Sequence, residues 1–493
     1  MKVLFLNPPF FKRFSREQRS PAVTKSNTLY YPKWLATAAG VAIKNHHDVY
    51  FIDAPAQDYD LKKVIDFIEN KNIEALICDT STPSFNNDLN VVEQIKNRFN
   101  KMHTIMVGRP ISTYGANTLK NNTFIDAVAI REYEYTVRDW LAALSCGSDL
   151  INVPGLIYRK NQEIVTNITR KPIANLDELP FVSEVYKRFL NIEDYFYGHS
   201  LHPLVVFDTS RGCPYRCSFC AYPQTFSGHT MRYRSVENVA DEFDFVKKEL
   251  PQVKTIMLED DTFIVNKKRT ELLADELIKR GNKIPFDSNC RADIGDDINL
   301  LSKLNKAGAR LFCVGFESGD PDVIKGMSKN LNPKKNDTYH RDAISFVNTC
   351  KRAGIMVHGC FMFGNLDDTK ESIQKTLDFA KKLDVDTAQF FPIMVYPGTE
   401  SYNQAKEKGY LSSENPDDWL TKDGLHNSVV NLPNLTKEDL VNFADKARRE
   451  FYLRPKYLIK KILQSFKSPN EFKRNLIGFK SLLKYLIKGS GVS

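Results

Sequence analysis

The 493-residue chain contains no run that approaches the roughly 20 consecutive apolar residues of a transmembrane helix. The apolar start of the sequence, within residues 1–9, is far too short for a secretory signal peptide. Six of the nine cysteines stand alone, a pattern that does not fit the disulfide framework of a small secreted protein. We therefore expect a protein of the reducing cytoplasm that is neither secreted nor integral to a membrane.

Outside its last forty residues the chain also lacks any charge imbalance. The net charge is +9, and the tail from Arg454 onward, with ten Lys or Arg and one acid, carries all of it. Segments 457–463 and 482–488 alternate bulky apolar residues with lysine, which is typical of an amphipathic helix on an anionic membrane surface. The alternative is a helix packed on the protein with its lysines in water. No RNA- or DNA-binding module is recognisable, so no nucleic-acid partner is expected.

The remaining three cysteines, Cys213, Cys217 and Cys220, form a C-x3-C-x2-C cluster near the middle of the chain. Thiolates are the ligands of iron–sulfur clusters, and three close cysteines without a fourth would leave one iron of a four-iron cluster open to another ligand. A structural zinc site would need a fourth ligand at close range, and no His or Cys lies between Cys220 and His229. A zinc knuckle and disulfide bonding are the alternatives to a cluster.

This spacing, with the aromatic Phe219 directly before the third cysteine, resembles the radical S-adenosylmethionine (SAM) superfamily. In that family the open iron chelates the amine and carboxylate of SAM, and an electron from the cluster cleaves SAM to a 5′-deoxyadenosyl radical. The resemblance implies a 4Fe-4S cluster on Cys213, Cys217 and Cys220, SAM as a cofactor, and Phe219 as part of the SAM site. It also implies an electron donor such as flavodoxin or ferredoxin. It names no catalytic residue that acts on the substrate.

Residues 1–145 alternate short apolar strands with helices, which predicts a Rossmann-like, doubly wound parallel sheet. Ligands of such sheets bind at the carboxyl ends of the strands, where Asn7, Ser81, Thr82 and Gly108 are candidates. The region resembles the cobalamin-binding domain that precedes the barrel in many radical SAM enzymes. It lacks the Asp-x-His-x-x-Gly motif, so cobalamin would bind without that histidine. The alternative is a scaffold that binds no cobalamin.

The rest of the α/β chain divides into three parts. Residues 146–200 read as a linker with a hairpin, residues 201–425 as a partial (β/α)6 radical SAM barrel, and residues 426–493 as a basic helical segment. The six barrel strands are predicted at 204–207, 255–258, 286–291, 310–319, 356–364 and 387–392.

Polar residues follow several of these strands, where the active sites of parallel barrels gather. Glu259 or Asp260 could accept hydrogen bonds from the ammonium group of SAM, with a helix cap or surface turn as the alternative. Arg291 and Glu317 resemble positions that contact the carboxylate and other polar groups of SAM, with a salt bridge as the alternative. The strands also contain Cys290, Cys313 and Cys360. These cysteines can be interpreted as small buried residues. Any of them that faces the barrel pocket could instead donate a hydrogen atom or bind a metal.

Within about residues 1–410, several short segments resemble a narrower group, the hopanoid-biosynthesis radical SAM family: 7–9, 53–56, 80–85, 179–188, 201–203 and 223–235. Members of that family are linked to remodelling a sugar on a membrane lipid. The resemblance implies a radical enzyme that remodels a lipid-linked sugar or polyol head group at the inner face of the membrane. His202 and His229 are then candidates for positioning substrate hydroxyls, with structural hydrogen bonds as the alternative.

Two other functions remain open on the sequence. The first is a cobalamin-dependent radical SAM methyltransferase acting on an unactivated carbon, which requires cobalamin to bind residues 1–145. The second is a metal-binding or membrane-associated scaffold without enzymatic activity, which predicts no SAM cleavage under reducing conditions.

Overall fold

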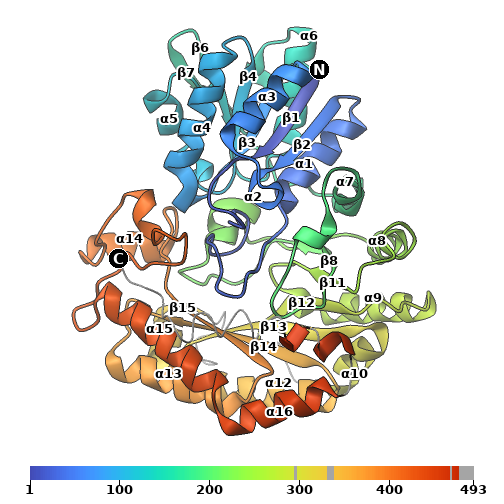
Figure 1. The fold of residues 1–493 in the computed structure, drawn as a ribbon, viewed down its shortest axis with the longest axis vertical. Helices are drawn as coiled ribbons and strands as arrows, with labels where there is room; N and C mark the ends of the chain where they lie inside the picture. Colours follow the sequence, from blue (N-terminus) through green and yellow to red (C-terminus); the bar gives the residue numbers. More distant parts are fainter. Residues whose placement is uncertain (294–296, 330–337, 467–468, 473, 477–493) are drawn as a thin grey trace.

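The computed structural model describes residues 1–293, 297–329, 338–466, 469–472 and 474–476. An N-terminal α/β domain lies at the top of Figure 1, and a second parallel sheet with its own helices lies below it. The C-terminal helices run from the left of this second sheet to its lower edge. The predicted α/β class, with two parallel sheets and a mostly helical C-terminus, is confirmed.

The first sheet has seven strands in the order β2-β1-β3-β4-β5-β6-β7, and its first five strands are parallel. The predicted hairpin is present as β6 and β7, which pair antiparallel with β5 and with each other. The hairpin therefore continues the N-terminal sheet. The strands are β1 (Lys2–Asn7), β2 (Asp48–Asp53), β3 (Ala75–Asp79), β4 (His103–Val107), β5 (Ala127–Ala129), β6 (Leu156–Lys160) and β7 (Glu163–Thr166).

Helices cover both faces of this sheet. Val3 and Phe5 of β1 pack toward one set of helices, and Leu4 and Leu6 pack toward the other, which explains why the strand is a continuous apolar run. The first face carries α1 (Lys33–Lys44), α6 (Glu134–Cys146) and α7 (Val182–Phe189). The second face carries α3 (Leu61–Lys71), α4 (Phe85–Arg98) and α5 (Ile111–Asn121), and the short α2 (Ala54–Gln57) follows β2.

The second sheet has six parallel strands in the order β15-β14-β13-β12-β11-β8, as predicted for the barrel. Its strands are β8 (Leu204–Phe207), β11 (Thr255–Leu258), β12 (Phe286–Cys290), β13 (Ala309–Glu317), β14 (Met356–Phe363) and β15 (Thr387–Pro392). Its helices are α8 (Val236–Glu249), α9 (Lys267–Lys279), α10 (Ile298–Ala307), α11 (Pro321–Gly326), α12 (Tyr339–Arg352), α13 (Lys370–Leu383) and α14 (Glu400–Glu407).

Two helices close the open edge of the barrel beside β15: α15 (Lys437–Tyr452) and α16 (Pro455–Ser465). Arg448 and Tyr452 of α15 donate hydrogen bonds to the backbone carbonyls of Phe390 and Ala388. The predicted amphipathic segment at 482–488 lies outside the described residues. None of the helices in the described part of the chain combines the length and apolar character needed to cross a bilayer.

A long connection, residues 8–32, links β1 to α1 and lies against both domains. Its Glu17 carboxylate accepts hydrogen bonds from the backbone N–H groups of Trp34 (2.8 Å) and Leu35 (3.1 Å), which caps the start of α1. The Tyr222 hydroxyl, from the second domain, donates to the Glu17 carbonyl. The connection therefore joins the first helix of one domain to the loop region of the other.

Candidate active site

The three motif cysteines lie in one loop directly after the first barrel strand. The loop runs between two short strands that pair antiparallel, β9 (Ser210–Arg211) and β10 (Arg232–Tyr233), so its two ends are held together. Cys217 is buried, and Cys213 and Cys220 are partly exposed. Burial raises the pKa of the Cys213 thiol to about 12 and that of Cys220 to about 11, with a smaller contribution from the neighbouring motif cysteines.

Backbone contacts shape this loop. Gly212 has a φ of +90°, and a Cβ there would lie 2.2 Å from the carbonyl oxygen of Thr230. The Gln224 side-chain amide donates to the carbonyls of Cys217, Ser218 and Cys220 at 2.9–3.2 Å. The Cys217 and Ser218 carbonyls also accept hydrogen bonds from the backbone N–H groups of Cys220 and Ser401. Gln224 therefore joins three carbonyls of the loop through one side chain and helps to fix the arrangement of the cysteines.

We expect Gly212→Ala to disturb the cysteine loop, because alanine adds both a clash with backbone and a left-handed conformation. Gly281→Ala is the matched control, since Gly281 also has a positive φ (+64°), lies outside the cysteine loop, and has nothing within 4 Å of its added Cβ. Iron content after anaerobic cluster reconstitution should fall by more than half in Gly212→Ala. The Gly281→Ala variant should lose about 1–2 kcal/mol of stability and keep its iron. Equal iron loss in both variants would contradict this account of the loop.

The thiols of the loop suit a cluster better than a single ion. Among the described residues, only one set of three Cys, His, Asp or Glu side chains has ligand atoms within 4.8 Å of one another, and it does not include the motif cysteines. A single tetrahedral ion would need the thiols closer than this. Three thiols on one loop, too widely spaced for one ion, fit a four-iron cluster that keeps an open iron.

Arg291, predicted to contact the SAM carboxylate, lies beside the cluster loop. Its Nη1 is 3.6 Å from the Cys217 sulfur, and its guanidinium stacks on the Tyr215 ring at 3.6 Å from the centroid. It also forms a two-point ion pair with Asp293 at 2.8 and 2.7 Å and donates to the Lys329 carbonyl. The side chain is therefore held rigidly at the loop, and the salt bridge considered as its alternative is present.

Glu317 ends β13 with a φ of +65°, a left-handed conformation that costs a non-glycine residue free energy. Its carboxylate forms a buried ion pair with Lys329 at 2.7 Å. Phe219 packs near this pair, against an apolar group from α11 and α12 that includes Met327 and Tyr339. The Glu317–Lys329 pair therefore lies beside Phe219 of the cysteine loop, and contact of these residues with SAM stays a prediction.

The adjacent acids Glu259 and Asp260 have different surroundings. Asp260 is fully buried, and its carboxylate accepts bonds from the backbone and hydroxyl groups of both Thr209 and Ser210, just before the cysteine loop. Glu259 is partly exposed to a cavity and accepts one bond from Asn289 at 3.2 Å. Burial raises the pKa of both carboxyl groups. Asp260 therefore anchors the loop, and Glu259 is free to meet a ligand.

Glu259 faces a small polar cavity between the two domains. The charged side chains around it come from the long connection, from the start of α1 and from the barrel. We call it the polar cavity; its charged lining residues are Glu17, Arg19, Lys33, Asp208, Arg211, Glu259 and Asp261. Charges of both signs from two domains meet here, which suits a zwitterionic ligand such as the methionine part of SAM.

The predicted cobalamin residues lie together at the carboxyl edge of the first sheet, but most of their polar groups already bond to other residues of the protein. The Asn7 side chain bonds to Asp53 and Arg16, and the Ser81 hydroxyl bonds to Ser84. Thr82 is buried in the same turn. A Cβ at Gly108 would lie 2.3 Å from the Thr80 carbonyl, so glycine lets the backbones after β3 and β4 approach closely.

One buried polar atom at this edge has no partner. The sheet order β2-β1-β3 makes the ends of β1 and β3 the switch point where ligands of such sheets bind. Asp79, the last residue of β3, has a buried Oδ2 without a hydrogen-bond partner among the described residues. Burial raises the pKa of its carboxyl group to about 7. An orphaned carboxyl oxygen at the switch point fits a ligand rich in amide donors, as the corrin side chains are.

Sequence reasoning missed the long connection, which supplies the buried Arg16 and the partly exposed Arg19. Arg16 forms a fully buried two-point ion pair with Asp88, at 2.6 and 3.1 Å, and Arg19 reaches Asp261 at 3.4 Å. The partners are 72 and 242 positions apart in sequence, so no local motif shows them. A connection of this length without regular structure was itself a signal of a functional loop.

The two histidines proposed for the substrate both bond to backbone. His229 Nδ1 lies 3.1 Å from the carbonyl oxygen of Cys213, and His202 Nε2 lies 2.9 Å from that of Glu193. His229 is therefore part of the cysteine loop, whereas His202 lies in the connector. The structure does not bring them together with each other.

A much larger cavity, of about 500 Å³, fills the space between the barrel strands, the long connection and helices α15 and α16. We call it the large cavity. Its wall includes Phe390 and Phe391 of β15 and Leu458 and Ile462 of α16, and Arg448 contributes a charge. Tyr30 lines both this cavity and the polar cavity. A substrate in the large cavity would therefore lie next to the polar cavity, which residues of the cysteine loop such as Tyr222 also line.

Comparison with known proteins identifies the family of the chain. The family model described as the radical SAM superfamily matches residues 208–380, and the model described as the B12 binding domain matches residues 19–141. An uncharacterized methyltransferase of Pyrococcus horikoshii is 30% identical over 465 residues, covering 94% of this chain and 95% of that protein. The chain belongs to the radical SAM superfamily, among the members whose radical domain follows a B12-binding domain.

Two solved structures share the fold. The radical SAM methyltransferase TsrM from Kitasatospora setae, with cobalamin and a [4Fe-4S] cluster bound, has a TM-score of 0.69 at 15% identity, covering 98% of this chain and 99% of that one. The cobalamin-dependent SAM radical enzyme OxsB has a TM-score of 0.68 at 16% identity, covering 99% and 73%. Bacteriochlorophyllide d C-12(1)-methyltransferase of Chlorobaculum tepidum is 27% identical over half of each chain.

The protein is therefore a radical SAM enzyme, and its cofactors are a 4Fe-4S cluster, SAM and cobalamin. These relatives favour methyl transfer, the first alternative from the sequence, over remodelling of a lipid-linked sugar. The resemblance to the hopanoid family stays a prediction. Binding to a membrane surface and the use of an electron donor such as flavodoxin or ferredoxin also stay predictions.

Proposed function

We propose that the protein is a cobalamin-dependent methyltransferase that acts on an unactivated carbon. The observation that carries this proposal is the Pyrococcus horikoshii relative, a methyltransferase that matches almost the whole of both chains, including both domains. Two features support it: the cysteine loop is a candidate position for the cluster, and the orphaned Asp79 carboxyl is one for cobalamin. When bound, the cluster supplies the electron that cleaves SAM, and cobalamin supplies the methyl group.

The chain's own residues would bind and orient SAM beside the cluster. We assign Cys213, Cys217 and Cys220 to the cluster, and Glu259 to the ammonium group of SAM because it faces the polar cavity. Arg291 already pairs with Asp293, so binding the SAM carboxylate requires that group to replace the Asp293 carboxylate. Phe219 and the Glu317–Lys329 pair would border the same site.

The large cavity indicates the kind of substrate. Its wall is apolar along β15 and α16, and it is also lined by Arg448 and Arg474, which pair with Asp445 and Glu471. A cavity of about 500 Å³ is of the size that encloses a drug-sized ligand. We therefore infer an amphipathic substrate with a long apolar part and an anionic group that competes with one of these carboxylates for its arginine.

One observation favours a lipid substrate. Ile459, Ile462 and Leu463 of α16 are each more than half exposed, and Leu458 and Ile462 also line the large cavity. An apolar surface continuous with a cavity would let an acyl or isoprenoid chain pass from a membrane surface to the radical. This route serves methylation of a lipid chain and equally the remodelling of a lipid head group, which is the second candidate function.

The deciding experiment supplies SAM that carries a trideuterated methyl group to the anaerobically reconstituted enzyme, with cobalamin, a strong reductant and a lipid extract. We expect 5′-deoxyadenosine, S-adenosylhomocysteine and a lipid whose mass increases by one labelled methyl group. A head-group product without label, formed with deoxyadenosine, would support remodelling instead. Absence of both adenosine products from enzyme with a full cluster would overturn both candidate functions.

A further inference from the structure

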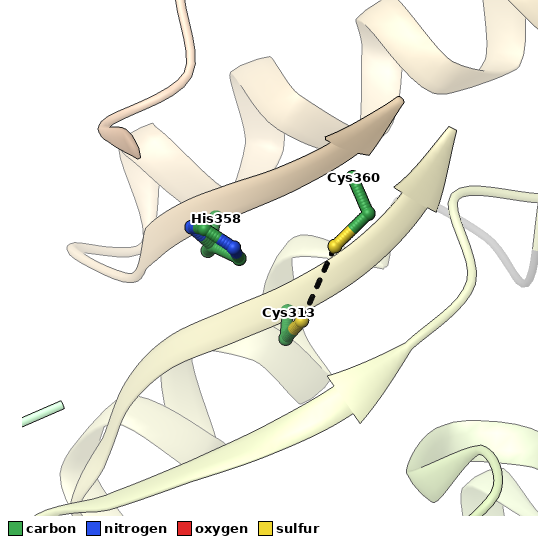
Figure 2. A group of neighbouring side chains, drawn as sticks. All are labelled: Cys313, His358 and Cys360. Atoms are coloured by element: carbon green, nitrogen blue, oxygen red, sulfur yellow. Dashed lines mark hydrogen bonds between the residues drawn. The ribbon is translucent and has the colours of Figure 1, made fainter. Parts of the chain in front are cut away.

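A second cysteine-containing cluster lies inside the barrel, on two adjacent strands. Cys313 belongs to β13, and His358 and Cys360 belong to β14. Cys313 pairs in register with His358, and the two β14 residues are two positions apart, so all three side chains lie on one face of the sheet. Figure 2 shows them above the two strands, with the Cys360 sulfur pointing to that of Cys313.

The spacing of these atoms matches that of metal ligands. The two sulfurs are 3.7 Å apart, and one ligand atom from each of the three residues lies within 4.8 Å of the others. Two sulfurs bound at about 2.3 Å to a tetrahedral zinc ion lie about 3.8 Å apart, so a metal could bind without movement of either strand. A disulfide would instead require the sulfurs to approach to about 2.05 Å.

Neighbouring side chains hold the histidine as a ligand. His358 Nδ1 lies 2.8 Å from the Thr387 hydroxyl on β15, the strand on the opposite side of β14 from Cys313. A hydrogen bond from one ring nitrogen to the protein, which leaves the other nitrogen for the metal, is typical of ligating histidines. The His199 ring stacks on His358 with 4.7 Å between centroids. His199 is 8% exposed, and its Nε2 has no hydrogen-bond partner among the described residues.

The cluster opens onto the large cavity. His358 and Thr387 line that cavity, and Cys313 and Cys360 are only partly buried. Tyr30 lines both this cavity and the polar cavity. A metal here would therefore face the space assigned to the substrate.

We propose that Cys313, His358 and Cys360 form a three-ligand site for one thiophilic divalent ion, zinc foremost, whose fourth coordination position faces the large cavity. Two sulfurs and one imidazole select zinc over magnesium or calcium. Three protein ligands are typical of zinc sites that keep a position for water or substrate, whereas structural sites are closed by four. The open position would hold an anionic or thiol group of the substrate and so fix its orientation. Both thiols lose their protons to solvent when the metal binds.

The test measures zinc and iron together in the cluster-reconstituted protein, after addition of Zn²⁺ and removal of loose metal with a weak chelator. We expect about one zinc ion per chain in wild type. The variant Cys313→Ala/Cys360→Ala should contain none, while its iron content stays at the wild-type level. Cys290→Ala is the matched control, because Cys290 is a buried thiol on the next strand, β12, and should leave both metals unchanged.

A second variant keeps the test decisive if the double variant loses iron as well. His358→Gln retains both thiols and should bind Zn²⁺ at least about tenfold more weakly. Co²⁺ added in place of Zn²⁺ should produce a thiolate charge-transfer band in wild type that the double variant lacks. The proposal is overturned if wild type holds no more zinc than the double variant. It is also overturned if the thiols prove to be a disulfide and take up no Zn²⁺ after reduction.

Discussion

Replacing Cys213, Cys217 and Cys220 together by alanine is expected to remove essentially all cluster iron and to reduce SAM cleavage by more than about a hundredfold. The physical reason is that no other residue can supply the electron or chelate SAM through an open iron. The measurement is 5′-deoxyadenosine formed under a strong reductant, together with the visible absorbance of the cluster. The change should leave the fold intact, since the loop is held by Gln224 and Asp260 rather than by the thiols.

Cys146→Ser provides the control for this variant, because Cys146 is an exposed cysteine in α6 and lies outside the site. It should retain iron, colour and SAM cleavage. If the triple variant kept its absorbance and iron, the assignment of the cluster to this loop would be wrong. If the triple variant lost zinc rather than iron, the motif would be a structural zinc site.

Arg16→Ala is expected to destabilise the protein by about 3–5 kcal/mol, because it leaves the Asp88 carboxylate buried without its cation. Both side chains are 0% exposed, and Asp88 also accepts bonds from Thr80 and Ser84 beside the predicted cobalamin site. Urea unfolding followed by the fluorescence of the three tryptophans, Trp34, Trp140 and Trp419, would measure the change. Cobalamin affinity should fall with it, because the turn after β3 depends on Asp88.

Lys12→Ala is the matched control, since Lys12 lies in the same connection and its ion pair with Asp58 is about two-thirds exposed. It should cost no more than about 1 kcal/mol. Adding Asp88→Asn to Arg16→Ala should restore part of the lost stability by removing the unpaired charge. Equal losses of unfolding free energy for Arg16→Ala and Lys12→Ala would show that the buried ion pair contributes no more to stability than the exposed one.

Strand positions could be predicted from the sequence because each strand carries its own signal. The strands of the barrel are apolar runs between polar turns, and β8, β11 and β15 were predicted with the bounds the structure shows. The alternation of strands and helices in residues 1–145 was also predicted, and the structure shows it. The pairing of the hairpin β6–β7 with β5 could not be predicted from the local sequence, because the sequence of a hairpin does not determine which sheet edge it pairs with.

Site residues that belong to a local motif could be predicted from the sequence. Those that come together only in the fold, from distant positions, were missed. The cysteine spacing is local, so Cys213, Cys217 and Cys220 could be named at once. The sequence could not show which of Glu259 and Asp260 is available to SAM. Only the fold shows that the Asp260 carboxylate already accepts hydrogen bonds from Thr209 and Ser210. The cluster of Cys313 with His358 and Cys360 joins two strands 45 positions apart and has no sequence signature.

The connection formed by residues 8–32 has a practical consequence for how this enzyme could be divided. Tyr31 donates a hydrogen bond to the Leu204 carbonyl at the start of the barrel, and Trp34 packs edge-on against Phe226 at 4.6 Å. One apolar core runs from α1 and α6 through to the barrel strands. Either half expressed alone would expose this face to water and aggregate, so the B12-type domain could not be exchanged with that of a relative without its partner barrel.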